Sequence, residues 1–450
     1  MTLKTTRRNF LRATAATGAG VIIMKDLLAQ ESPNEKIAFA SVGVGGKGHS
    51  DSGDAANAGE MVAICDTNRN QLKGATERFE NAKQYEDYRV MFDEMGDKID
   101  AFTVSTADHM HGIISAHGMN MGKHCFTQKP LTRTIYEARR LGEIAREKKL
   151  VTQMGNQGCS SGGLRESAAM LRAGLLGEVK EVIVWTNRPI WPQGGSRGEP
   201  MDVPEYLNWE CWLGMAPERP YSVNYDPFAW RGWWDFGTGA LGDMACHTVN
   251  MPFAGLDIKN PQWVQAISSG HNYDSLPKWS VINFEFPENA WRPGFKFTWM
   301  DGGQRPDPEL LDGNKPDGSG SLVIGTKGKL YSPGDMGDTQ VFYGISADEV
   351  NAFRENADYP RSPGHFQEFA QGIKANDPSI CWSRFDEYAG PLTETILLGN
   401  LAVWGASKPE EMGPKVEWDA VNLRITNDPE DKGRLESLVT PTFLNGYEKF

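Results

Sequence analysis

Cysteine is scarce in this chain, and the few cysteines are scattered. The 450 residues contain 6 of them, and no two form a C-x-x-C pair. Disulfide frameworks and thiolate zinc sites both show themselves through regularly spaced cysteines, so neither is expected here. Most of the cysteines are expected to be small buried side chains.

Long apolar runs and an excess of basic charge are also missing. No hydrophobic stretch reaches the roughly 20 residues that a membrane-spanning helix needs. With 46 basic and 59 acidic residues, the formal net charge is -13. Such a charge repels phosphate backbones and anionic lipids, so nucleic acid and membrane surfaces are poor partners. The length suits two domains better than a single core.

The first residues carry a different signal. Residues 6–12 read T-R-R-N-F-L-R, and a small, mildly apolar run follows over 13–24. Paired arginines before such a run are typical of twin-arginine export, here to the periplasm. We predict a signal and linker over 1–32, either cleaved near Ala29 or retained as an uncleaved anchor. Export of a folded chain would allow a cofactor to be bound in the cytoplasm first.

A glycine-rich turn follows the first buried strand, which is predicted over 36–42. The turn reads G-V-G-G-K-G and supplies Gly43, Gly45, Gly46 and Gly48. Glycines in this pattern permit a tight turn and let a pyrophosphate approach the backbone, although the helix signal over 49–57 is poor. A second strand over 61–65 ends in Asp66, whose carboxylate can bind the ribose hydroxyls of NAD. NAD is therefore favoured, with NADP still open because Arg69 lies nearby.

Strands and helices then alternate as in a doubly wound parallel sheet. Helices are predicted over 70–81, 88–95, 112–121 and 134–149, and strands over 101–105, 124–127 and 150–154. This indicates a dinucleotide-binding domain over 33–157. Ligands lie at the carboxyl edge of such sheets. The cofactor-binding candidates at that edge, besides the glycines and Asp66, are Ser105, His111, Gln128 and Gln157.

The pattern changes over 158–450, where a substrate domain is predicted. A helix is expected over 164–173, and strands over 179–186, 262–269, 278–286 and 294–299. Residues 321–324 and 329–332 read as a hairpin, because a glycine pair separates them. Helices over 363–375 and 385–399 are expected to pack back across both domains. The segment after 409 has a weak pattern, and no function is assigned to it.

Aromatic residues gather in a long irregular stretch that begins at Arg188. Seven of the 14 tryptophans fall between 185 and 234, and residues 230–247 read W-R-G-W-W-D-F-G-T-G-A-L-G-D-M-A-C-H. On a helix, Asp243 and His247 would share one face. Trp209 and Trp212 are interpreted as packing residues. The substrate-binding candidates are Arg188, Trp230, Arg231, Trp233 and Trp234.

Taken together, G-V-G-G-K-G, S-T-A-D-H-M-H, G-K-H-C-F-T-Q-K-P-L and G-D-M-A-C-H make the chain resemble the Gfo/Idh/MocA oxidoreductases. The resemblance implies a Rossmann domain followed by an α/β domain with a large, mostly antiparallel open sheet, which commonly serves as a subunit interface. It implies NAD or NADP as cofactor and a sugar or polyol as substrate. It also implies catalytic roles for Lys129, Asp243 and His247. Gln128 departs from the glutamate usual in that family.

The chemistry expected from these residues is hydride transfer. His247, oriented by Asp243, would remove a hydroxyl proton, and Lys129 would stabilise the developing alkoxide. Free NAD is scarce in the periplasm, so the cofactor is expected to be tightly bound and recycled. Three alternatives stay open: glycoside hydrolysis through transient oxidation, a non-catalytic binding protein prompted by Gln128, and a metal site. The metal site would use His109, His111, Asp243 and His247, but the prediction assigns no metal.

Overall fold

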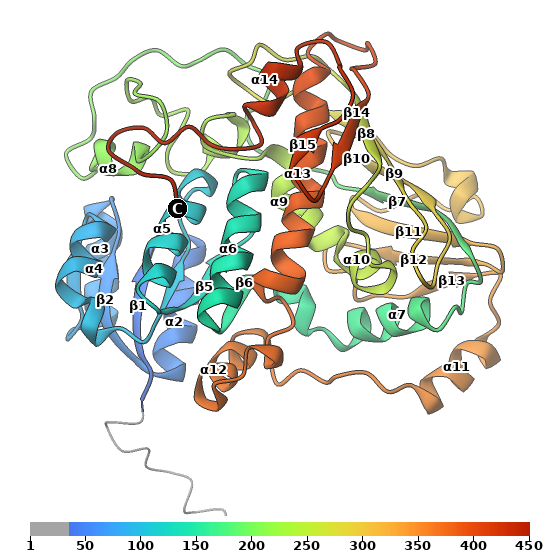
Figure 1. Ribbon diagram of the computed structural model, residues 1–450, viewed down its shortest axis with the longest axis horizontal. Helices are drawn as coiled ribbons and strands as arrows, with labels where there is room; N and C mark the ends of the chain where they lie inside the picture. Colours follow the sequence, from blue (N-terminus) through green and yellow to red (C-terminus); the bar gives the residue numbers. More distant parts are fainter. Residues whose placement is uncertain (1–35) are drawn as a thin grey trace, which may run out of the picture.

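The computed structural model describes residues 36–450, so the predicted twin-arginine signal lies outside the described residues. Two sheets organise this part of the chain (Figure 1). The first has six strands in the order β3-β2-β1-β4-β5-β6, and the second has nine in the order β13-β12-β11-β7-β10-β9-β8-β14-β15. Every strand pair of the first sheet is parallel. The second sheet is antiparallel except where β10 pairs with β7. The predicted fold class is confirmed.

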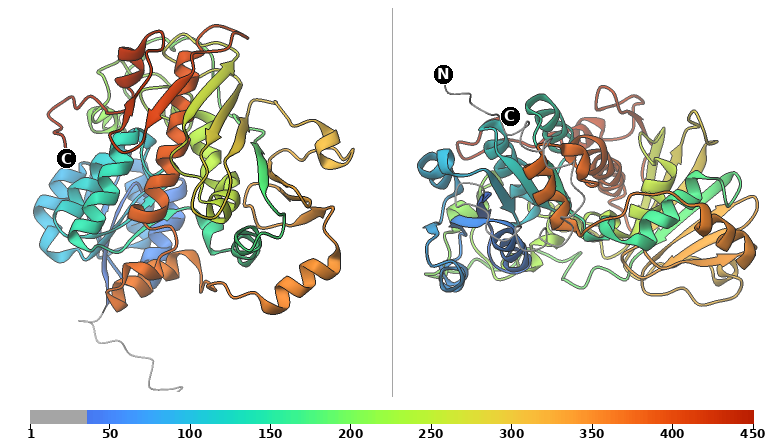
Figure 2. Two further views of the ribbon diagram at one scale, coloured as in Figure 1. Left: turned by 45° about the vertical axis from the view of Figure 1, so that its right-hand side comes forward. Right: turned by 90° about the horizontal axis from the view of Figure 1, so that it is seen from below.

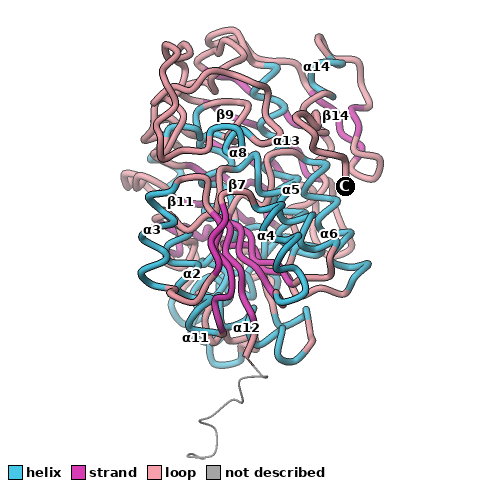
Figure 3. Tube along the Cα trace, turned by 90° about the vertical axis from the view of Figure 1, so that its left-hand side faces the viewer, coloured by secondary structure: helices cyan, strands magenta, loops and turns pink. Residues whose placement is uncertain are grey.

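The first sheet is a doubly wound α/β unit with helices on both faces (Figure 3). Its elements are β1 (Ala38–Val42), α2 (Lys47–Ala58), β2 (Glu60–Cys65), α3 (Arg69–Arg78), β3 (Lys83–Tyr85), α4 (Tyr88–Met95), β4 (Ala101–Val104), α5 (Asp108–Asn120), β5 (His124–Gln128), α6 (Ile135–Lys148) and β6 (Thr152–Gly155). The central strand β4 is buried throughout, as expected for a parallel strand covered on both faces. All carboxyl ends therefore meet at one edge.

Helix α2 is longer and better packed than its sequence suggests. Residues 49–57 have a poor helix signal, yet α2 runs over twelve residues and buries Gly48, Asp51, Ser52 and Ala55. A Cβ atom on Gly48 would lie 2.0 Å from the carbonyl oxygen of Gly43. Small side chains thus let the helix approach the turn that precedes it, and tertiary packing overrides the weak propensity.

The second half builds the mixed sheet and the helices that pack against it. Its elements are α7 (Gly162–Arg172), β7 (Val179–Trp185), α8 (Trp209–Leu213), α9 (Gly239–Thr248), α10 (Asn250–Leu256), β8 (Trp263–Ser268), β9 (Ser280–Phe286), β10 (Phe295–Met300), β11 (Gly320–Gly325), β12 (Lys329–Pro333), β13 (Val341–Tyr343), α11 (Ala347–Asn356), α12 (His365–Ala375), α13 (Gly390–Gly405), β14 (Val416–Asp419), β15 (Arg424–Ile425) and α14 (Lys432–Glu436). Buried and partly exposed residues alternate along β8 and β9, as in a sheet with one covered face.

Helices α12 and α13 return to the first sheet, as predicted, and α13 lies between the two sheets (Figure 2). Phe366 and Phe369 of α12 share a core with Phe39 of β1 and Phe126 of β5. Arg139 of α6 pairs with Glu394 of α13 at 2.6 Å. The core of the dinucleotide domain is therefore completed by residues far away in sequence. Within residues 36–450, no helix has both the length and the apolar character that crossing a membrane requires.

Candidate functional site

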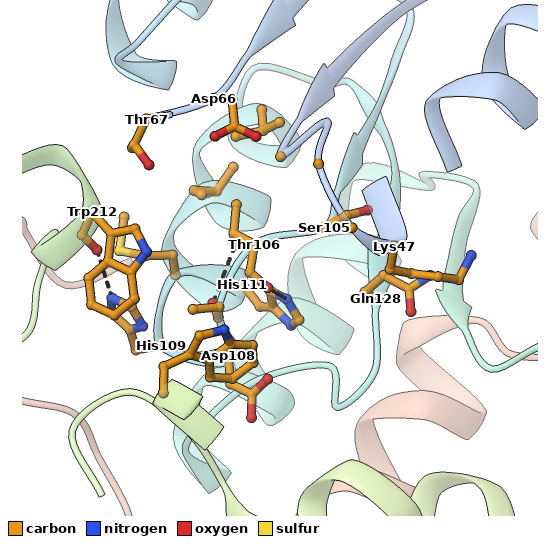
Figure 4. A pocket seen from close by; sticks show the side chains of 18 of the residues that line it. Lys47, Asp66, Thr67, Ser105, Thr106, Asp108, His109, His111, Gln128 and Trp212 are labelled. Carbon is orange, nitrogen blue, oxygen red and sulfur yellow. Dashed lines mark hydrogen bonds between the residues drawn. The ribbon is translucent and has the colours of Figure 1, made fainter. Parts of the chain in front are cut away.

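A cavity of about 550 Å³ lies at the carboxyl edge of the first sheet (Figure 4). It borders the glycine-rich turn, the ends of β2, β4 and β5, part of the long connection after β7, and α9. The cavity has two ends because it follows the strand order across the sheet. One end lies near the edge strand β3, and the other lies near β5 and β6 on the opposite side of the sheet. One end is lined by Asp66, Glu86 and Asp87, and the other by Lys129 and His247.

The glycine-rich turn has the geometry that a pyrophosphate group requires. Gly43 has φ +80°, and a Cβ atom there would lie 2.5 Å from the Ser105 carbonyl oxygen. Gly46 has φ +50°, with no atom within 4 Å of the position a Cβ would take, and it precedes α2 without any side-chain cap. Uncapped N–H groups at a helix start attract phosphate oxygens. Gly43, Gly45 and Gly46 line the cavity as predicted, whereas Gly48 serves the packing of α2.

Asp66 lies at the end of β2 with both carboxylate oxygens held by the backbone. Its oxygens accept from the N–H groups of Val44 and Asn68, each at 2.9 Å. Burial raises the pKa of Asp66 although these backbone donors oppose it. A carboxylate has about four lone-pair sites and these donors do not fill them all, so the side chain can still accept from ribose hydroxyls.

The surroundings of Asp66 are acidic, and Arg69 pairs with Glu86 rather than with Asp66 itself. Glu86, Asp87 and Asp226 also line this end of the cavity. Burial, followed by the charge of Asp66, raises the pKa of Asp226 to about 6. Arg69 instead pairs with Glu86 at 2.6 Å and donates to the Glu205 carbonyl at 2.7 Å. A 2′-phosphate here would meet carboxylates, which is unfavourable for NADP.

A buried carboxylate that sequence reasoning missed connects three parts of the site. Asp51 of α2 accepts from Lys47 Nζ at 2.5 Å, from Ser105 Oγ at 2.7 Å and from Gln128 Nε2 at 2.8 Å. Gln128 is thus held by Asp51 rather than left without an ionic partner. The only local signal was the four-residue spacing of Lys47 and Asp51, which is common on exposed helices.

Lys129 follows β5 and forms an ion pair with Asp243 of α9. Its Nζ lies 2.7 Å from Asp243 Oδ1 and 2.9 Å from the Asp243 carbonyl oxygen. The Nε of Arg231 lies 3.4 Å from the same Oδ1. Burial alone would raise the pKa of Asp243, but Lys129 and Arg231 outweigh it and keep the pKa below its ordinary value. An ammonium has three hydrogens, so one remains for an oxygen in the cavity.

His247 is held by Asn156, which corrects the prediction that Asp243 orients it. His247 Nδ1 lies 3.1 Å from Asn156 Oδ1, while Asn156 Nδ2 donates to the Cys246 carbonyl at 2.5 Å. Because the Asn156 oxygen can only accept, Nδ1 carries the hydrogen and Nε2 has a free lone pair. Burial, with the nearby charge of Lys129, lowers the pKa of His247 to about 3. The ring is therefore a neutral base at the cavity wall.

The two histidines at the start of α5 are bound by backbone carbonyls. His111 places Nδ1 2.8 Å from the Pro130 carbonyl and Nε2 3.0 Å from that of Thr106. His109 Nε2 lies 3.0 Å from the Trp212 carbonyl. Both line the cavity, where His111 fixes the loop after β4 to the segment after Lys129. No group of three or more potential metal ligands occurs among residues 36–450.

The aromatic residues predicted to face a substrate divide into two sets. Trp230 and Arg231 line the cavity, and the Arg231 guanidinium lies 4.2 Å from the Trp230 ring centroid. Trp233 packs against Tyr225, and Trp234 against Trp404. Their proposed contact with a substrate is therefore wrong: both are buried core residues.

Trp212, Arg188 and Gln157 differ in their positions relative to the cavity. Trp212 stacks on Trp209 at 4.8 Å, as a packing residue would, but it also lines the cavity. Arg188 lies outside the cavity lining and pairs with Asp335 at 3.6 Å. Gln157 lines the cavity beside Lys47, as expected for a residue after β6.

Two family models match the chain. The "Oxidoreductase family, NAD-binding Rossmann fold" model covers residues 36–156, and the "Oxidoreductase family, C-terminal alpha/beta domain" model covers 167–429. The second match alone spans more than half of the chain. Residues 430–450 lie beyond both matches.

The individual relatives have low sequence identity to this chain. The dTDP-3,4-didehydro-2,6-dideoxy-alpha-D-glucose 3-reductase of Actinomadura kijaniata is 30% identical over 138 residues, or 31% of this chain and 41% of that enzyme. The chain thus spans less than half the length of this curated relative. The WlbA dehydrogenase of Bordetella pertussis, solved with NADH and UDP-GlcNAcA, has a TM-score of 0.58 at 17% identity, over 85% of this chain and 100% of that one. An inositol dehydrogenase homolog of Azotobacter vinelandii, solved with NADH and myo-inositol, has a TM-score of 0.55 at 16% identity, over 85% and 98%.

Proposed function

The chain belongs to the Gfo/Idh/MocA family of oxidoreductases, and within it we propose an NAD-dependent enzyme that oxidises or reduces a carbinol carbon of a sugar derivative. One observation carries the proposal: the dinucleotide cavity ends at a neutral histidine and a lysine ammonium, His247 and Lys129. A hydroxyl placed between them would meet both a base and a positive charge. The sugar nucleotide and inositol bound by structural neighbours support a polyhydroxylated substrate.

The residues of this chain prepare the site for that chemistry. The amides at the start of α2 and the carboxylate of Asp66 would hold the pyrophosphate and the ribose, and Ser105 and Gln128 would border the nicotinamide. When bound, NAD supplies a hydride acceptor at its nicotinamide ring. Asp51 keeps Ser105 and Gln128 in fixed positions, which favours a single orientation of the ring.

Proton transfer falls to His247 and charge stabilisation to Lys129. In the oxidation direction, His247 Nε2 takes the hydroxyl proton, and Nδ1 stays protonated against Asn156. Lys129, positioned by Asp243, donates to the same oxygen as negative charge develops on it. Reduction runs through the same contacts in reverse. Trp230 and Arg231 border the space in which the rest of the sugar would lie.

The test is His247→Ala, with His117→Ala, in the last turn of α5 and outside the cavity lining, as the control. Loss of a positioned base is expected to lower kcat by roughly 100- to 10,000-fold, while the Kd for NADH stays near that of wild type. The pH profile supplies a second measurement. Because the pKa of His247 is lowered to about 3, wild-type kcat/KM is expected to show no acid limb near pH 6.5. Unchanged turnover in the variant would remove His247 from the mechanism.

We also propose that the cofactor is NAD, that it stays bound between turnovers, and that the chain is exported. The acidic surroundings of Asp66 support NAD over NADP. The twin-arginine sequence at 6–12 supports export, and scarce NAD outside the cytoplasm then favours retention. Freshly purified protein, denatured at once, should release about one NAD per chain, and Arg7→Lys with Arg8→Lys should leave the protein in the cytoplasm. An empty extract would contradict retention, and unaltered export would contradict the signal.

A further inference from the structure

The last described segment of the chain crosses the top of the dinucleotide domain. In Figure 1 it runs from α14 past α8 and ends above α5. Three contacts fix it there: the Tyr136 backbone N–H donates to the Val439 carbonyl at 2.9 Å, Tyr136 Oη donates to the Phe450 carbonyl at 2.6 Å, and Asn445 Nδ2 donates to the Gly214 carbonyl at 2.7 Å. Residues 439–450, here called the closing segment, are thus attached to both halves of the molecule.

One side chain of the closing segment forms part of the cavity wall. Tyr447 lines the cavity together with Tyr88, Asp87 and Cys211. The Arg89 guanidinium lies 5.0 Å from the Tyr447 ring centroid and is itself held by Asp87 at 2.6 Å. Burial raises the pKa of Tyr447 to about 12, although Arg89 opposes the shift. The ring is therefore a neutral, partly buried surface that lies beside a guanidinium.

The topology shows which part of a dinucleotide this ring would meet. Tyr88 and Asp87 follow β3, at the edge of the sheet beyond β2 and Asp66. Lys129 follows β5, on the opposite side of the glycine-rich turn. If Asp66 binds the adenosine ribose, the base attached to that ribose extends toward Tyr447 and away from Lys129.

We propose that Tyr447 is a binding residue for the adenine of the cofactor, and that the closing segment covers this end of the cavity. The inference rests on the proposed function, because it assumes a bound NAD. Residues 430–450 lie outside both family matches, so neither family model describes this contact. An aromatic face beside a base gives stacking, and a covered adenine slows cofactor release.

The experiment measures Kd for NADH and for ADP-ribose, which keeps the adenine and lacks nicotinamide. Tyr447→Ala is expected to weaken the binding of both ligands by about the same factor, roughly 10-fold, because one base–aromatic stack is lost. Tyr447→Phe, which keeps the ring, should bind both ligands like wild type. Tyr273→Ala is the matched control, because the Arg434 guanidinium lies 4.9 Å from its ring centroid and Tyr273 is outside the cavity lining.

The outcomes separate this inference from the proposed function. Weaker NADH binding with unchanged ADP-ribose binding, or no change in either, would overturn the role of Tyr447 and leave the oxidoreductase proposal in place. Equal weakening in Tyr447→Ala and in Tyr273→Ala would also overturn it, because the effect would then be general. A wild-type chain that binds neither ligand would overturn both.

Discussion

At the two ends of the cavity, the pKa values of the buried carboxylates Asp66 and Asp243 are shifted in opposite directions. At the Asp66 end, burial raises the pKa of Asp66 and of Asp226 because no cation lies against them. At the His247 end, Asp243 is also buried, but Lys129 and Arg231 keep its pKa below the ordinary value. One end therefore has negative charge available to bind neutral hydroxyls and repel phosphate. The other has a paired lysine and a neutral imidazole, which suits proton transfer and charge development.

Among the changes that test this contrast in charge, the largest effect is expected from removing the cation at the His247 end. Lys129→Ala would lower kcat by roughly 100- to 1000-fold, as loss of one oxyanion-stabilising group does. It would also leave Asp243 with Arg231 as its nearest cation, so the pKa contrast between the two ends should shrink. Steady-state kinetics with Kd for NADH measured in parallel checks this. A loss confined to Kd would show that Lys129 serves cofactor binding alone.

A second, intermediate effect tests the acidic end. Asp66→Ala should weaken the binding of NADH and strengthen the binding of NADPH. The preference for NADH should fall by roughly 10- to 100-fold, because like charges in close contact cost several kcal/mol. Arg69→Ala is the control: Arg69 lies outside the cavity lining and pairs with the lining residue Glu86 rather than with Asp66, so its loss should not lower the preference for NADH. If Arg69→Ala abolished NADPH binding, the arrangement described for this end would be wrong.

The smallest expected effect concerns stability. The folded pKa of Asp226 is about 6 against an ordinary 3.8, so its contribution to stability is present below pH 3.8 and is lost as pH rises through 6. Asp226→Asn removes that loss, so the free energy of unfolding should rise by about 1 kcal/mol above pH 7 and by almost nothing at pH 4. The figure is discounted for the partial exposure of Asp226. Thermal unfolding at both pH values checks this, with exposed Asp202→Asn as the control. An equal gain at both pH values would contradict the titration.

Sequence patterns predicted the helices, turns and strand ends that are determined by residues close together in the sequence. The helix expected over 88–95 is α4 (Tyr88–Met95), and the hairpin expected around 325–328 is formed by β11 and β12. Lys129 pairs with Asp243 and lines the cavity with His247, because each of the three follows or lies on an element that the pattern located. Strand ends are predictable because a parallel sheet brings them to one edge.

The contacts that sequence reasoning missed join distant positions. Asp51 meets Gln128 across 77 residues, and Asn156 meets His247 across 91. Buried polar residues on a helix with a poor pattern give no local signal of such a role. Trp233 and Trp234 show the opposite error, since tryptophans beside a glycine turn serve a core as readily as a sugar. Tyr447 lies in a segment whose weak pattern gave no hint of its place in the cavity wall.

The most direct test of the central claim follows the hydride itself. Sugars and polyols deuterated at their carbinol carbons would be mixed with the NAD-loaded protein, and the reduced cofactor analysed by mass spectrometry. We predict that at least one substrate delivers a single deuterium to the nicotinamide ring, and that His247→Ala does so at least about 100-fold more slowly. Reduced cofactor without deuterium, or equal rates in wild type and variant, would contradict the account.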